Sequence, residues 1–242
     1  MSKKYRLSAS LVFIVVVGIV LLKNIPAESS NYSPKDVISI CQKGCNYTSI
    51  QAAIDNPNTL PGSILVIKDQ IHTEAAIEVG KNVTITGSVG ENTIIQAHKA
   101  PAKADERVVL IKQGVTATLK NVIIRHGFPK KYPGSGGGIG NLGALKLINV
   151  QILENDASTS GGGIWNKGEL SILNSIITKN RAHRSGPLGE ACGAGGGIQN
   201  EKGGQLIIEG SKITHNSSDS RGGGLFISCD TTAVVKDSVI SH

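Results

Sequence analysis

Gly136-Gly137-Gly138-Ile139-Gly140-Asn141 begins a pattern that occurs four times in the chain. Later copies open at Gly161–Ile164, Gly195–Ile198 and Gly222–Leu225, so the aliphatic residues after the glycine triplets are 25, 34 and 27 residues apart. One such unit cannot bury its apolar face alone, whereas stacked units bury a continuous core. The stretch therefore predicts a solenoid.

Each glycine triplet is followed by an alternating run and then, in the first three copies, by Ile-x-x-Asn. In Leu145-Lys146-Leu147 the apolar residues are two apart, which is the period of a strand with one face inward. Repeats of helical hairpins are longer, at about 33 to 47 residues, and less rich in glycine. Stacked strands predict two aliphatic ladders: Leu119/Leu147/Ile172/Ile208/Val235 and Ile124/Ile152/Ile177/Ile213/Ile240.

The Gly-Gly-Gly-Ile and Ile-x-x-Asn elements resemble repeats of right-handed parallel β-helix proteins of the pectin-lyase-like superfamily. They are similar to the Gly-Gly-Ala-Ile and Phe-x-x-Asn repeats of polymorphic outer-membrane proteins. Upstream, Tyr47–Asp55 and Ile71–Gly87 resemble the opening coils of secreted bacterial β-helix proteins. The resemblance spans roughly residues 41 to 242. It implies an all-β, single-stranded right-handed β-helix, and a short amphipathic helix is predicted to cover its N-terminal end.

The superfamily includes lyases, hydrolases, esterases, adhesins and inert spacers, so the resemblance implies a fold rather than one activity. Its calcium-dependent lyases use Asp and Glu ligands, and its hydrolases and esterases use two or three aspartates. In this chain the carboxylates do not stack, because the residue before the ladder asparagine is Glu154, then Lys179, then His215. We predict no catalytic residue, no metal site and no cofactor; calcium enters only under the alternative of a lyase.

Two rows of asparagine accompany the ladders. We expect them to be structural: at a bend, Asn satisfies backbone groups, tolerates left-handed φ, and hydrogen-bonds along a stack. The glycine triplets permit tight corners. The rows are Asn141/Asn166/Asn200 and Asn155/Asn180/Asn216.

The N-terminus has the layout of an export segment. Lys3, Lys4 and Arg6 precede an uncharged run at residues 7–22, which is shorter than the roughly 20 residues that span a bilayer. We predict a signal peptide or, as the alternative, an uncleaved membrane anchor over 1–27, a linker over 28–36 and the β-helix over 37–242. Either alternative places the repeats outside the cytoplasm, in a secreted or cell-envelope location.

Cys41 and Cys45 lie just before the first coil, and an oxidising compartment favours a disulfide between them. Zinc is the alternative, although the loop offers no nearby His or further Cys to complete a tetrahedral site. Thr48-x-x-Gln51 has the pattern of a capping box and predicts a helix start.

The formal charge of +7 favours an anionic partner. No basic motif flanked by aromatic residues is visible, which argues against nucleic acid. Segments that join each Ile-x-x-Asn to the next glycine triplet leave from one corner, and long loops on a rigid solenoid often bind ligands. The alternative is a solvated basic fringe. The candidate ligand-binding residues are Arg125, His126, Lys130, Lys131, Tyr132, Arg181, His183 and Arg184.

These features predict a non-enzymatic surface or adhesin-like module that binds acidic polysaccharide, with an enzyme acting on polysaccharides as the alternative. Contact with a membrane is expected only through the N-terminal segment. The strand pattern at Val234–Ile240 has no polar cap after it, and an uncovered strand edge invites strand addition. We therefore expect either further coils or end-to-end self-association.

Overall fold

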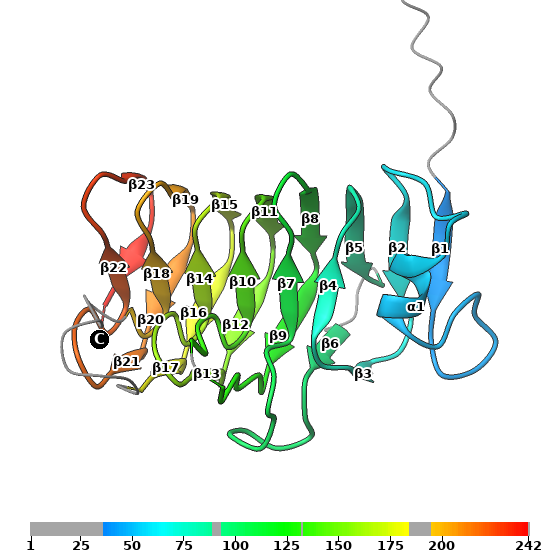
Figure 1. Cartoon of the computed structure of the whole chain (residues 1–242), viewed down its shortest axis with the longest axis horizontal. Helices are drawn as coiled ribbons and strands as arrows, with labels where there is room; N and C mark the ends of the chain where they lie inside the picture. The colour runs from blue at the N-terminus through cyan, green and yellow to red at the C-terminus, as the bar shows by residue number, and fades with distance from the viewer. Residues whose placement is uncertain (1–35, 89–92, 132, 184–194, 242) are drawn as a thin grey trace, which may run out of the picture. The chain divides into compact units, whose positions relative to one another are not determined.

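The structure is a computed structural model that describes residues 36–88, 93–131, 133–183 and 195–241. These residues belong to one compact unit, Pro34–His242. In this unit the chain runs through successive coils whose equivalent strands lie side by side (Figure 1). The predicted export segment, and the linker up to residue 35, lie outside the described residues.

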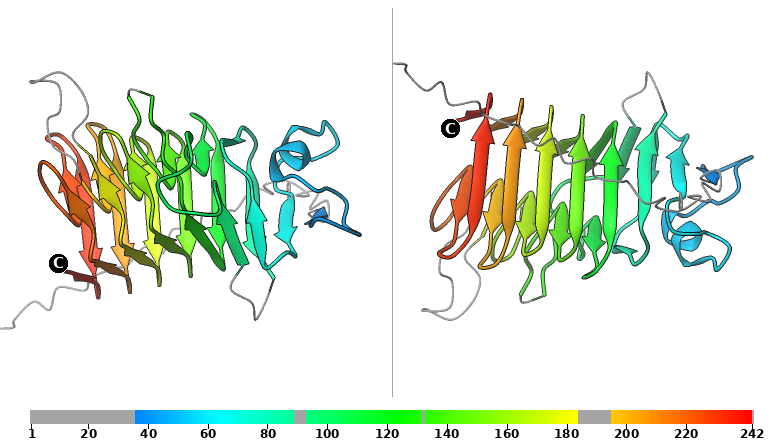
Figure 2. Two further views of the ribbon diagram at one scale, coloured as in Figure 1. Left: turned by 90° about the horizontal axis from the view of Figure 1, so that it is seen from below. Right: turned by 90° about the horizontal axis from the view of Figure 1, so that it is seen from above.

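Nearly every coil contributes one strand to sheet A, and all strand pairs in this sheet are parallel (Figure 2, right). In the described ranges it consists of β1 (Val37–Ile40), β2 (Ile64–Ile67), β5 (Val83–Gly87), β8 (Thr116–Lys120), β11 (Ala144–Ile148), β15 (Glu169–Leu173), β19 (Gln205–Glu209) and β23 (Thr232–Lys236).

Three further parallel sheets complete the coils. Sheet B contains β3 (Ile71–Thr73), β6 (Thr93–Gln96), β9 (Val122–Arg125), β12 (Gln151–Leu153), β16 (Ile176–Thr178), β20 (Lys212–Thr214) and β24 (Val239–Ile240). Sheet C contains β4 (Ile77–Val79), β7 (Val109–Ile111), β10 (Ile139–Asn141), β14 (Ile164–Asn166), β18 (Ile198–Asn200) and β22 (Leu225–Ile227). Sheet D contains β13 (Asp156–Ala157), β17 (Arg181–Ala182) and β21 (Ser217–Ser218).

Both predicted aliphatic ladders are confirmed residue by residue. Leu147 pairs with Leu119 and Ile172 in sheet A, and Ile177 pairs with Ile152 and Ile213 in sheet B. The first four residues of each ladder are buried. The fifth residues, Val235 and Ile240, are 42% exposed, because no coil of the described chain covers them. End-to-end association stays a prediction.

The asparagine rows are confirmed as structural. Asn166 accepts from the Asn141 side chain at 2.7 Å and donates to Asn200 at 2.6 Å, and Asn180 likewise links Asn155 to Asn216 at 3.0 and 2.9 Å. All six side chains are buried. Because each amide donates up the stack and accepts from below, the rows satisfy polar groups that burial would otherwise leave without partners.

The expectation of left-handed φ at these asparagines is wrong. In the Asn155/Asn180/Asn216 row the left-handed residue lies one position earlier, at Glu154 (φ 54°), Lys179 (φ 55°) and His215 (φ 54°). The ladder asparagine itself is then free to point inward. Glycine is needed at Gly162, because a Cβ there would clash with the carbonyl oxygen of Arg181, which follows the ladder asparagine Asn180 in the next coil.

The N-terminal end departs from the repeat. Cys41 and Cys45 form a disulfide, and α1 (Ile50–Asp55) packs against β1 and β4. The predicted capping pair of Thr48 and Gln51 is wrong by one residue: the N-cap is Ser49, whose side chain accepts from the Ala52 N–H. The expected partner at Gln51 is replaced by Glu74, a carboxylate that directly follows β3.

Candidate functional site

Three of the loops that the sequence places on one flank begin side by side. Their first residues pair as sheet D, with Asp156 opposite Arg181 and Arg181 opposite Ser217. Arg181 donates to Asp219 at 3.0 Å, and His183 Nε2 lies 3.0 Å from Asp156 Oδ1. Here two side chains of the predicted site, Arg181 and His183, contact carboxylates of neighbouring coils.

Lys130 and Arg125 also make internal contacts. Lys130 Nζ lies 2.7 Å from Asp105 Oδ1 and 5.7 Å from the centre of the Phe128 ring. Arg125 donates through two nitrogens to Gln96 Oε1, at 2.9 and 2.8 Å. These contacts join the flank to the preceding coil. Asp105 offsets the charge of Lys130, whereas the neutral amide of Gln96 leaves the charge of Arg125 in place.

His126 is a buried corner residue with φ 61°. Its Nδ1 lies 3.0 Å from the carbonyl oxygen of His98, and its Nε2 lies 3.2 Å from Glu154 Oε2. Both ring nitrogens are therefore occupied. Lys131 is exposed, while Tyr132 and Arg184 lie outside the described residues. Ligand binding by these flank residues stays a prediction.

The outer face of sheet C carries a second set of groups. The central residue of each strand points outward, because the residues on either side of it belong to inward ladders. In register, from β4 to β22, these residues are Glu78, Leu110, Gly140, Trp165, Gln199 and Phe226. The row thus places the single Trp of the chain beside the position that has no side chain.

Arg107 fills the space above Gly140. A Cβ built on Gly140 would overlap the guanidinium Nη1 of Arg107 and would lie 3.1 Å from Leu110 Cδ1. The guanidinium therefore lies on the outer face of sheet C between Leu110 and Trp165. Gly140 makes this possible, since any larger residue in the row would displace the cation.

Arg107 is a charged group near two carboxylates, Glu106 and Glu78, that do not hydrogen-bond to it. Burial lowers the pKa of Arg107, and the opposing effects of Glu106 and Glu78 do not cancel it. A guanidinium nevertheless stays protonated in proteins. Among the described residues none forms a hydrogen bond or a salt bridge with it; Glu78 instead binds Lys112 Nζ at 2.6 Å. An incoming anion would provide the missing acceptor.

A hollow of about 180 Å³ lies beside this cation, lined by Ala76, Glu78, Glu106, Arg107 and Leu110. On the other side of Gly140, the partly exposed Trp165 donates from Nε1 to Glu201 at 3.3 Å. That hydrogen bond fixes the indole. Hollow, cation and aromatic ring thus follow one another along the stacking direction.

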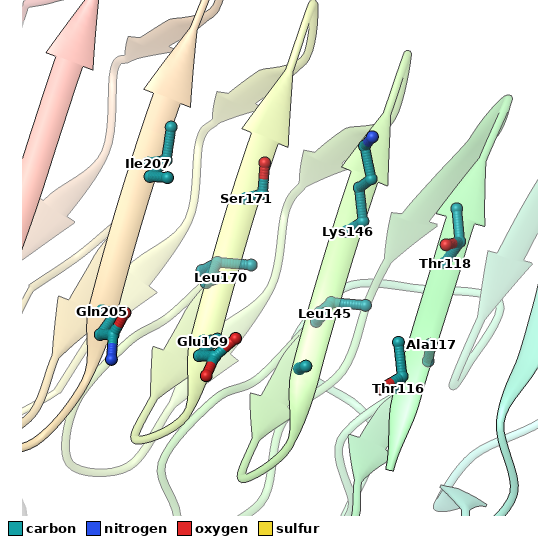
Figure 3. A pocket seen from close by; sticks show the side chains of 11 residues that line it. Thr116, Ala117, Thr118, Leu145, Lys146, Glu169, Leu170, Ser171, Gln205 and Ile207 are labelled. Atoms are coloured by element: carbon teal, nitrogen blue, oxygen red, sulfur yellow. The ribbon is translucent and has the colours of Figure 1, made fainter. Parts of the chain in front are cut away.

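A hollow of about 230 Å³ lies on sheet A, across β8, β11, β15 and β19 (Figure 3). Thr118, Lys146, Ser171 and Ile207 lie in one row along it. The surface mixes hydroxyl, apolar and oppositely charged groups, with Glu169 in the next row. It therefore favours neither an anion nor a cation.

The described residues contain no group of three or more His, Cys, Asp and Glu placed to hold a metal ion. Within the same ranges no helix is long and apolar enough to cross a membrane. The chain matches no model of a known protein family, no curated protein and no solved structure.

Sequence reasoning missed Arg107 and Trp165, although a signal existed. The alignment of the glycine triplets already sets Gly140 beside Trp165, and an aromatic residue between two inward positions must point outward. Arg107 carried no such signal, because it belongs to an irregular segment before β7. Only the fold brings it over Gly140.

Proposed function

We propose that this protein is a non-enzymatic, extracytoplasmic surface module that binds acidic polysaccharide along the outer face of sheet C. We also propose that its coils wind as a right-handed β-helix of the pectin-lyase-like class, with α1 covering the N-terminal end. The binding proposal is carried by one observation: the Arg107 guanidinium lies over Gly140, between Leu110 and Trp165, and no carboxylate of the described residues is hydrogen-bonded to it.

The chemistry of this row suits a uronic acid or a similarly charged sugar. A guanidinium recognises a carboxylate through paired N–H donors, and partial burial strengthens that interaction. The apolar face of a sugar ring can pack on the indole of Trp165 while its carboxylate meets Arg107. The row continues to the half-buried Phe226, so a linear polymer lying along the stack would meet a second aromatic ring. Gln199, between Trp165 and Phe226, is buried and accepts from the Gly195 N–H.

The test is retention of the full-length chain on immobilised polygalacturonate at low and high salt. We expect retention of the wild type that weakens with salt, and at least about tenfold weaker binding for Arg107→Gln, because a charged hydrogen-bond donor is lost. Lys202→Gln is the matched control, since Lys202 is an exposed cation paired with Asp230 at 3.2 Å. Equal retention of the two variants would contradict the site.

A second experiment distinguishes binding at the flank loops from binding at sheet C. Replacing Lys130, Lys131, Arg181 and Arg184 together by Ser should weaken retention less than Arg107→Gln does, because Lys130 and Arg181 are neutralised by Asp105 and Asp219. The opposite order would move the site to the flank. Release of unsaturated or reducing sugar, with or without calcium, would instead favour the enzyme.

A further inference from the structure

His72, in the middle of β3, is an ionisable side chain buried at the irregular N-terminal end, with 1% of its surface exposed. Its ring lies between two carboxylates. Nε2 lies 2.8 Å from Glu74 Oε2, and Nδ1 lies 3.6 Å from Asp69 Oδ2. These two acids are the titratable groups that face the ring.

Glu74 connects His72 to α1. Its Oε2 accepts from the Ile50 N–H at 2.7 Å, and its Oε1 accepts from the Gln51 N–H at 2.9 Å and from Ser49 Oγ at 2.8 Å. Helix α1 thus faces Glu74 with donors only, and its own Asp55 accepts from the Gln51 side chain instead. Glu74 must be ionised to accept from all of these groups.

Asp69 connects His72 to the disulfide loop. The Gln42 N–H, next to Cys41, donates to Asp69 Oδ2 at 3.0 Å. One imidazole therefore lies between the carboxylate that holds the loop and the carboxylate that holds the helix. His72 itself lies in register with Ile95 and Ile124, at the N-terminal start of the sheet B ladder.

Counting protons selects one charge state of the ring. If the neutral ring carries its proton on Nε2, it donates to Glu74, but Nδ1 is then a buried acceptor facing the Asp69 carboxylate. If the proton is on Nδ1, the bare Nε2 faces Glu74 Oε2 at 2.8 Å, which sets two acceptors against each other. Only the imidazolium offers a donor to both acids. Nδ1 has no hydrogen-bond partner among the described residues, so Asp69 is its nearest available acceptor.

We propose that His72 is a pH-dependent clip: the protonated ring bridges Asp69 and Glu74 and so holds the disulfide loop and α1 on the first coil. Loss of its proton removes one of the two donors and leaves a buried nitrogen facing a carboxylate. The N-terminal end then loosens while the regular coils stay folded.

The shifts in pKa agree with this geometry. Burial lowers the pKa of His72, but the hydrogen bond with Glu74 and the nearby carboxylates of Glu74 and Asp69 outweigh burial and raise it above 6.5. Burial raises the pKa of Glu74, but donors from His72, Gln51, Ile50 and Ser49 lower it below 4.5. The stabilisation from His72 is thus full below pH 6.5 and lost as pH rises through its raised pKa; that from Glu74 is lost as pH falls through its lowered pKa.

The test is amide hydrogen exchange of the full-length chain at about pH 5.5 and about pH 8.5, corrected for the intrinsic rate. The reporters are the Ala53 and Asn56 amides, which donate within the helix region to Ser49 and Ala52. We expect their protection to fall roughly tenfold at the higher pH, the effect of one charged hydrogen bond. Protection of Ile172 in sheet A should stay constant.

Variants keep the test specific. His72→Gln should abolish the pH dependence of the α1 amides, and Asp69→Asn should reduce it, while the exposed His215→Gln should leave it unchanged. If His72→Gln fails to fold, the imidazole ¹⁵N shifts of the wild-type protein decide the question. A neutral His72 ring at pH 6, or α1 protection that ignores pH, would overturn the proposal.

Discussion

The regular coils and the N-terminal end are held together in different ways. From β8 onward, each coil adds aliphatic residues to the same two ladders, and the three coils from β10 to β20 also add asparagines to two shared rows, so that neighbouring coils support one another. Around α1 the contacts occur once: a disulfide, a helix cap and the His72 network. Stability is therefore distributed in one region and concentrated in a few side chains in the other.

This difference teaches which changes will be global and which local. In a solenoid, each coil contacts its neighbours, so a defect inside a ladder weakens two interfaces. A defect at the N-terminal end weakens only the first coil. The comparison predicts unequal effects for substitutions that look alike in the sequence, as the pair Ile176 and Ile177 illustrates.

The largest effect is expected from Ile177→Asp. Ile177 is fully buried between Ile152 and Ile213, and a carboxylate there would have no partner, so we expect a loss of about 4 kcal/mol or more. Ile176→Asp is the control, because the Ile176 side chain is 37% exposed. Thermal unfolding should separate the two variants clearly; equal Tm values would contradict the inward register.

An intermediate effect is expected from Asn180→Ala. The Asn180 amide donates to the Ile152 carbonyl at 2.9 Å and to Asn216 at 2.9 Å, and it accepts from the Asn155 side chain. Removing it leaves buried groups without partners, at a cost of about 2 to 3 kcal/mol. Chemical denaturation measures this loss. The exposed Asn58→Ala is expected to change stability by less than about 0.5 kcal/mol, so similar losses for both would deny the row its structural role.

The smallest global effect is expected from replacing Cys41 and Cys45 by Ser. A crosslink closing so short a loop contributes about 2 kcal/mol in the chain-entropy account, and it acts on the N-terminal end alone. Hydrogen exchange should therefore rise in β1 and α1, with Leu147 unchanged. Cooperative loss of protection along the whole of sheet A would show that the two regions are not independent.

The repeated part of the fold could be predicted from sequence because the same pattern of residues occurs several times along the chain. Ile-x-x-Asn fixes a register, and its three copies confirm one another, so the partners of Ile177 and Asn180 were predictable. Features that occur once had no such support. The helix cap was placed one residue early because its acid, Glu74, comes from 24 residues away along the chain.

The candidate site was likewise predictable where it follows from the repeat and unpredictable elsewhere. The adjacency of the flank loops follows from the repeat and is confirmed by the pairing of Arg181 with Asp156 and Ser217. The pairing of Lys130 with Asp105 was not predictable, because Asp105 belongs to a segment outside the repeat. Charge counted along a sequence does not show which cations are already neutralised.

The central functional claim is that an acidic glycan lies beside Trp165, and this residue reports on it directly because it is the single Trp of the chain. The measurement is a titration of its fluorescence with an oligogalacturonate, with a neutral malto-oligosaccharide in parallel. The account predicts a saturable, salt-sensitive change with the acidic sugar alone, which is lost in Arg107→Gln. No change in the wild type, or an equal change in Arg107→Gln, would contradict it.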